Sequence, residues 1–182
     1  DLDLFAGTFI NPKDFRGAIV HFENIGTPTL PRFRWVTDSF ANLTFTSLYN
    51  MRPQFYDLDL NGSMDLVFTG TSGGNTSLWY ILAPQGGPPQ FTGENLASLD
   101  IPIASGENVF MTDVDLDGRP DVLLGKNNGS LYHYQNTGTG TTHTFSLVND
   151  AFLGLDAGTT RQNPDPAVGD LDGDGKEDLI IG

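Results

Sequence analysis

The chain has 182 residues, 38% of them hydrophobic, which is enough apolar material for a folded core. It has no cysteine, so disulfides, thiolate zinc sites and cysteine nucleophiles are excluded. Its formal net charge of −14 at pH 7 and its lack of a long apolar run lead us to expect no nucleic-acid partner and no membrane span.

Three nonapeptides recur along the chain: DLDLNGSMD at residues 57–65, DVDLDGRPD at 113–121 and DLDGDGKED at 170–178. Each has an acid or amide at the first, third, fifth and ninth places and glycine at the sixth. Carboxylates packed this closely repel one another, and a hard divalent cation removes the conflict. Calcium takes six to eight oxygen ligands, and glycine permits the left-handed turn that such a loop needs.

The three loops therefore predict about three calcium sites. With the seventh-place residues included, the predicted ligands are Asp57, Asp59, Asn61, Ser63, Asp65, Asp113, Asp115, Asp117, Arg119, Asp121, Asp170, Asp172, Asp174, Lys176 and Asp178. The loops differ from the EF-hand, a helix–loop–helix calcium motif that has a bidentate Glu at the twelfth place and flanking helices. Here Phe68, Leu124 and Ile181 stand at the twelfth place, inside short apolar runs that indicate buried strands.

The ninth-place acids Asp65, Asp121 and Asp178 follow Asp3 at intervals of 62, 56 and 57 residues. Residues 1–3 thus match the end of a fourth loop. A repeat of this length with strand patterning alone is typical of propeller blades. We expect an all-β fold, a β-propeller fragment of four-stranded antiparallel blades with a calcium loop between the first and second strands. The expected parts are a partial blade at 1–50, blades at 51–106 and 107–163, and the start of another at 164–182.

Further strands can be placed within each repeat. The third strand is expected at AIVHFEN, SLWYILA and SLYHYQN, which begin at Ala18, Ser77 and Ser130. An aromatic residue, Phe33, Phe91 or Phe145, is expected to begin the outer strand. The segment ASLD near Leu99 is the one stretch that suggests a turn of helix.

The repeated D-x-D-x-D/N-G-x-x-D pattern with its apolar strand, together with LYHYQNTG at residues 131–138, resembles the FG-GAP or VCBS repeat. The resemblance implies calcium-bearing propeller blades of the kind found in integrin α-subunit heads and in secreted bacterial proteins. It therefore implies an extracellular or cell-surface location. The second repeat departs from the pattern at the exit from its third strand, where Ala83-Pro84-Gln85 replaces the Asn-Thr-Gly element.

Other residues suggest no catalytic site, and we expect no enzyme activity. His21 and His133 occupy equivalent places, which favours a structural role, and His143 is expected to be solvated. The acids outside the loops are scattered and expected at the surface: Glu23, Glu94, Glu107 and Asp156. The larger aromatic side chains either fill the space between blades or bind sugars and proteins at a rim: Trp35, Trp79, Tyr49, Tyr56 and Tyr132.

The leading functional expectation is a protein- or glycan-binding adhesion module with recognition loops on the face opposite the metal. These loops are residues 8–16, 37–50, 71–76, 126–129 and 149–162. The missing strands would come from the rest of a longer polypeptide or from another chain. Two alternatives stay open: a part of, or accessory to, an extracellular polysaccharide-degrading enzyme, and an architectural component of a secreted assembly.

Overall fold

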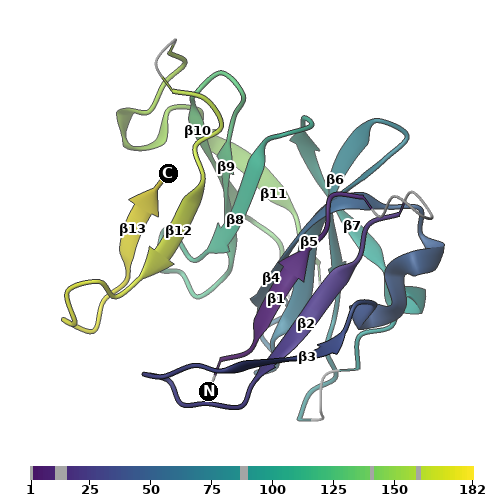
Figure 1. The fold of residues 1–182 in the computed structure, drawn as a ribbon. Helices are drawn as coiled ribbons and strands as arrows, with labels where there is room; N and C mark the ends of the chain where they lie inside the picture. Colours follow the sequence, from purple (N-terminus) through teal and green to yellow (C-terminus); the bar gives the residue numbers. More distant parts are fainter. Residues whose placement is uncertain (1, 11–15, 87–89, 140–141, 159–160) are drawn as a thin grey trace. The chain divides into compact units, whose positions relative to one another are not determined.

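The computed structural model describes residues 2–10, 16–86, 90–139, 142–158 and 161–182 (Figure 1). The fourth-loop prediction for Asp1, and parts of the predicted recognition loops 8–16 and 149–162, lie outside these residues. Within them the elements are strands and three short 3-10 helices, η1 (Phe40–Phe45), η2 (Gly93–Asn95) and η3 (Phe152–Gly154). None of these helices is long or apolar enough to cross a membrane.

The chain forms two compact units, one of Asp1–Phe55 and Asn61–Leu99, the other of Tyr56–Leu60 and Asp100–Gly182. The first unit contains a three-stranded sheet and nearly all of a four-stranded sheet, both with their strands in chain order. The strands of the three-stranded sheet are β1 (Leu4–Gly7), β2 (Ile19–Asn24) and β3 (Phe33–Thr37). Those of the four-stranded sheet are β4 (Tyr49–Tyr56), β5 (Asp65–Ser72), β6 (Asn75–Ile81) and β7 (Ala97–Ile103).

The second unit holds another four-stranded sheet and a two-stranded one, again in chain order (Figure 1). The four strands are β8 (Asn108–Thr112), β9 (Asp121–Gly125), β10 (Leu131–Asn136) and β11 (Phe145–Asn149). The remaining pair is β12 (Pro166–Gly169) and β13 (Asp178–Ile181). The prediction of an all-β fold with four-stranded antiparallel sheets is confirmed.

The core of the first unit lies where its two sheets pack together. Ile19 of β2, Met51 of β4 and Leu66 and Phe68 of β5 are almost completely buried there. Four rings pack against this cluster and against one another, those of Phe5, Phe40, Phe55 and Phe91. Apolar burial of this kind is the main favourable contribution to folding.

The close packing of neighbouring sheets depends on glycine at the end of the second strand of the repeat. A Cβ built on Gly125 would lie 1.7 Å from the carbonyl oxygen of Pro164, just before β12. A Cβ on Gly7 would lie 1.7 Å from the carbonyl oxygen of Met51 on β4. Both glycines end the apolar run after a ninth-place acid, so the same residue serves the same contact in both units.

Two sequence predictions in the second repeat are wrong. The segment at Leu99 belongs to strand β7, in which Leu99, Ile101 and Ile103 are buried and alternate with exposed residues. This period of two is that of a strand with one buried face, and it outweighs the local helical tendency. Phe91 does not begin the outer strand, because it precedes η2 and its ring joins the aromatic cluster of the core. Phe33 and Phe145 do begin β3 and β11.

Candidate metal-binding loops

The three nonapeptides share one backbone conformation in the hairpins that join the first and second strands of three sheets. In each loop the fourth and sixth residues have positive φ. The fourth-place angles are 59° at Leu60, 60° at Leu116 and 78° at Gly173, and the sixth-place angles are 87° at Gly62, 87° at Gly118 and 84° at Gly175. A left-handed conformation is costly for leucine, so its presence at two fourth places indicates that the surrounding hydrogen bonds dictate the turn.

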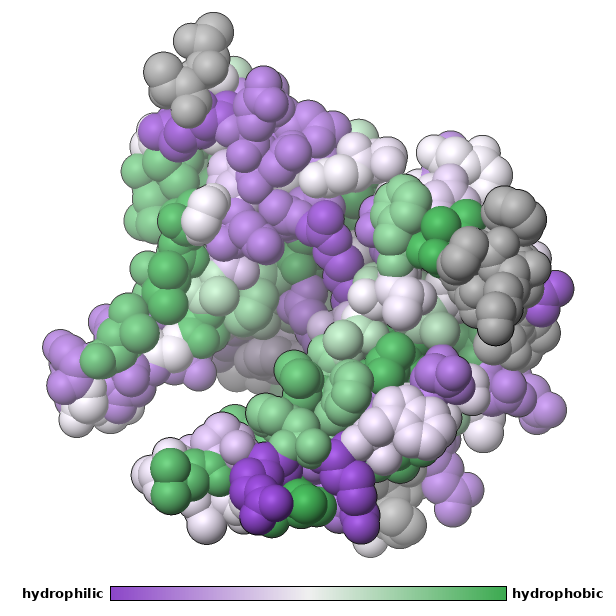
Figure 2. All heavy atoms as spheres, in the orientation of Figure 1, coloured by the Kyte–Doolittle hydropathy of each residue, from purple (hydrophilic) through white to green (hydrophobic). Residues whose placement is uncertain are grey.

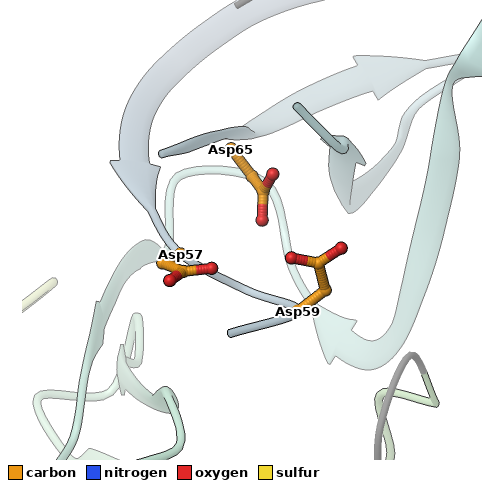
Figure 3. A group of neighbouring side chains, drawn as sticks. All are labelled: Asp57, Asp59 and Asp65. Carbon is orange, nitrogen blue, oxygen red and sulfur yellow. The ribbon is translucent and has the colours of Figure 1, made fainter. Parts of the chain in front are cut away.

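Carboxylate oxygens converge in all three loops. In each loop, one oxygen from each of three aspartates lies within 4.8 Å of the others. The three groups are Asp57, Asp59 and Asp65; Asp113, Asp115 and Asp117; and Asp170, Asp172 and Asp174. Figure 3 shows the first group, whose three carboxylates face a common space.

Backbone N–H groups hold the leading carboxylate inward. Asp113 accepts hydrogen bonds from the N–H of Asp117 at 3.0 Å and of Gly118 at 2.8 Å. The equivalent Asp170 accepts from Asp174 at 3.1 Å and from Gly175 at 3.0 Å. In Figure 2 the hairpin between β12 and β13, which carries this third loop, is largely hydrophilic. The loops thus preorganise acidic side chains that would otherwise separate by repulsion.

Side chains at the fifth and seventh places bind neighbouring chain segments. The Arg119 guanidinium donates to Asp117, which holds the pKa of that carboxyl below its usual value, and it reaches the carbonyl oxygen of Gly138 at 3.3 Å. Lys176 Nζ lies 3.4 Å from Asp174 Oδ2. Because both side chains are cationic, Arg119 and Lys176 could ligate a cation only through their main-chain carbonyl oxygens.

Polar side chains of the first loop bind the segment Ala83-Pro84-Gln85, which follows the third strand in place of the Asn-Thr-Gly element. Asn61 Nδ2 donates to the carbonyl oxygen of Ala83 at 2.9 Å, and Ser63 Oγ donates to that of Pro84 at 3.1 Å. Asn61 Oδ1 also accepts from the Ser63 N–H at 2.8 Å. The exit from the third strand in this repeat is therefore ordered by the loop itself.

The ninth-place acids lie in different surroundings. Asp65 is fully buried and joins the first carboxylate group. Asp121 is fully buried but stands outside the group formed by the first, third and fifth places of its loop. Its Oδ1 accepts from the Asn136 N–H at 2.8 Å, and its Oδ2 lies 2.9 Å from His133 Nε2. Asp178 accepts a hydrogen bond from the Leu171 N–H at 2.9 Å, within its own loop.

The contact between His133 and Asp121 has a counterpart in the first repeat, and the sequence analysis missed both. His21 Nε2 lies 2.9 Å from Asp3 Oδ2, while Asp3 Oδ1 accepts from the Asn24 N–H at 2.9 Å. The signal was present in the sequence as two histidines at equivalent places, each three residues before an asparagine. Their partners could be recognised only once the strand registers were known.

Two other sequence predictions are corrected by the structure. Glu107 was expected at the surface but is buried, with its carboxylate 2.7 Å from Lys126 Nζ and accepting from the Ala104 N–H at 2.8 Å. His143 was expected to be solvated but is half-buried, and this burial lowers its pKa. Charge pairing made the burial of Glu107 possible, and such pairing across 19 residues cannot be read from spacing.

The large aromatic side chains differ in how far they are buried. Trp79 packs against the core of the first unit, and Tyr49, Tyr56 and Tyr132 are half-buried. Burial and the neighbouring carboxylates of Asp113 and Glu177 raise the pKa of Tyr56. In contrast, Trp35 is 60% exposed on β3.

Comparison with known families places a match over the last two loops. Residues 113–181 match the FG-GAP-like repeat model. They include the second and third nonapeptides and all strands from β9 to β13. No curated protein and no solved structure matches the chain. The resemblance to the FG-GAP repeat that the motifs indicated is confirmed for residues 113–181, which form the matched repeat.

Proposed function

We propose that the chain is a calcium-stabilised β-propeller segment of a secreted or cell-surface protein and that it acts as a binding or adhesion module. The observation that supports this most directly is the convergence of three aspartates in each of three loops of one backbone conformation. Each four-stranded sheet would be one blade, with strands from a longer polypeptide or another chain completing the ring.

The chemistry of the donor set fits calcium. Every donor that gathers in the loops is an oxygen, which suits a hard cation and not a soft metal that prefers sulfur or imidazole. Asp57, Asp113 and Asp170 would each lead a ligand set, with the third-place and fifth-place residues, the seventh-place carbonyl oxygen and the ninth-place carboxylate, which already joins the group in the first loop. Bound calcium would neutralise the clustered charge and fix the hairpin between the first and second strands.

The proposed secreted or cell-surface location follows from calcium binding by the loops together with the resemblance to the FG-GAP repeat. Extracellular calcium modules bind with dissociation constants of about 10⁻⁴ to 10⁻³ M, which suits millimolar calcium outside cells. A chain without cysteine has no disulfides to stabilise it there, so metal-bound loops would take that role.

A binding role is supported by exposed aromatic rings on strand β3. Phe33 and Trp35 stand two residues apart on β3 and are 47% and 60% exposed, respectively. Side chains two residues apart share one face of a strand, so the rings can stack on a sugar or contact a protein. We propose binding without catalysis, because the two His–Asp pairs connect strands and, within the part of the chain that the structure describes, neither histidine has a hydrogen bond to a serine or threonine.

Calcium binding is tested by isothermal titration and thermal unfolding of the chain. We expect three bound ions and a melting temperature that rises by several degrees in millimolar calcium, because ligand binding to the folded state alone stabilises it. Magnesium at the same concentration is the control. Absence of binding in millimolar calcium would refute the metal-site part of the proposal.

The binding role is tested separately by tryptophan fluorescence with a panel of soluble polysaccharides, comparing the wild type with Trp35→Ala. Trp79, which packs in the core, provides the internal reference. We expect a saturable change in emission that is lost in Trp35→Ala. A saturable response that the variant retains would exclude Trp35 as the contact.

A further inference from the structure

We infer that His133 is a positioning residue for the second metal loop: its imidazole orients the Asp121 carboxylate for calcium. The inference rests on the proposed calcium function. His133 Nε2 lies 2.9 Å from Asp121 Oδ2, and both side chains are at least nine-tenths buried. Since an ionised carboxylate only accepts hydrogen bonds, the imidazole nitrogen is the donor.

Strand register explains why the two side chains meet. His133 on β10 pairs with Leu123 on β9, two residues beyond Asp121. Asp121 and Leu123 lie on the same face of β9, so His133 reaches Asp121 diagonally across the two strands. The same register places His21 opposite Phe5, two residues beyond Asp3. The arrangement is therefore built into the repeat.

The carboxylate is held at both oxygens and still has acceptor capacity. Asp121 Oδ1 accepts from the Asn136 N–H and Oδ2 accepts from His133. A carboxylate offers about four lone-pair sites, so two remain for a cation. Hydrogen bonds of this kind fix the orientation of metal ligands, and their loss commonly weakens metal affinity by about 10- to 100-fold.

The histidine is itself held in place from the other side. The ring of Phe152 in η3 packs on His133 with centroids 5.4 Å apart. In the first repeat Phe40 of η1 packs on His21 at 5.6 Å. Each phenylalanine precedes a residue of positive φ, 56° at Leu153 and 60° at Ala41. An identical support in two units argues that the ring position matters.

The equivalent histidine of the first repeat provides a control for substitutions of His133. His21 makes the same contact with Asp3, which lies outside the three nonapeptides at residues 57–65, 113–121 and 170–178. His21→Phe removes a comparable structural contact without affecting any of the three complete loops. His133→Phe removes the donor next to a complete loop, and His133→Gln retains an N–H donor.

The test is a calcium titration of the full chain followed by NMR in calcium-buffered solution, with the amides of Gly62, Gly118 and Gly175 reporting the three loops separately. We expect His133→Phe to weaken calcium binding at Gly118 at least about tenfold and to change the other two sites less than about twofold. His133→Gln should recover most of the loss, and His21→Phe should leave all three affinities unchanged.

Two results overturn the inference: unchanged affinity at Gly118 in His133→Phe, or an equal loss in His21→Phe. If His133→Phe does not fold, Phe152→Leu replaces it, with a loss of at least about threefold expected at Gly118 alone. Unchanged affinity in that variant also overturns the inference. Lack of calcium binding by the wild type would instead refute the proposed function and, with it, this inference.

Discussion

The N–H of Ala83 donates a 2.7 Å hydrogen bond to Oδ1 of Asp65, and both groups are buried. Asn136 and Asp121 make the equivalent bond at 2.8 Å, as Asn24 and Asp3 do at 2.9 Å. The ninth-place acid therefore ties the end of the third strand to the start of the second in three repeats. This tie uses the backbone of the third strand, which explains why the second repeat tolerates alanine where the others have asparagine.

Loss of a leading carboxylate should remove one ion. We expect Asp113→Ala or Asp170→Ala to lower the calcium stoichiometry from three to two, because the first-place acid organises its loop through two backbone N–H groups. Isothermal titration measures the stoichiometry. Asp100→Ala, an exposed acid on β7, is the matched control and should retain three ions. An unchanged stoichiometry in the loop variants would reject the ligand assignment.

A methyl group at Gly125 should be strongly destabilising. The added Cβ would lie 1.7 Å from the carbonyl oxygen of Pro164, a backbone atom that cannot move without shifting the segment before β12. We expect Gly125→Ala to lower the free energy of unfolding by about 3 kcal/mol or more, at the upper end for overpacking. Urea unfolding measures the loss. Gly169→Ala, which meets no atom within 4 Å, should change stability by less than about 1 kcal/mol.

The buried ion pair of Glu107 and Lys126 should be sensitive to the loss of one partner. Glu107→Ala would leave the ammonium group of Lys126, whose side chain is only 19% exposed, without its carboxylate. Breaking a buried pair typically costs about 3 to 5 kcal/mol. Chemical unfolding of Glu23→Ala, which breaks an exposed pair with Arg34, should show a loss under about 1 kcal/mol. Equal losses in the two variants would contradict this view of the pair.

The burial of His143 should make stability depend on pH below neutrality. Burial lowers the pKa of His143 from its ordinary value of 6.5, so the unfolded chain binds a proton more readily than the folded one. The contribution of the neutral His143 side chain to stability is complete above pH 6.5 and is lost as the pH falls through the lowered pKa. Unfolding free energies measured between pH 7.5 and 5 should therefore decline less in His143→Gln than in the wild type. A steeper decline in the variant would show that the sign is wrong.

The pattern of strands and loops was predictable because it is local. Gly118 and the alternate aspartates around it define a turn through short-range sterics and hydrogen bonds, and the apolar run to Gly125 has the composition of a buried strand. The second repeat was harder to predict, because Phe91 resembled an anchor in an outer strand while it belongs to the core. Local sequence does not reveal which side chains a distant sheet will cover.

By itself, the sequence determined the all-β class, the repeat, the three acidic loops and the resemblance of residues 113–181 to the FG-GAP repeat, since each depends on residues close together in the chain. Only the tertiary structure decided that Asp121 faces His133, that Glu107 is buried beside Lys126 and that Gly125 touches the backbone at Pro164. These contacts depend on strand register and on sheet packing. Both are set by the burial of apolar faces over the whole unit, so no short stretch of sequence contains them.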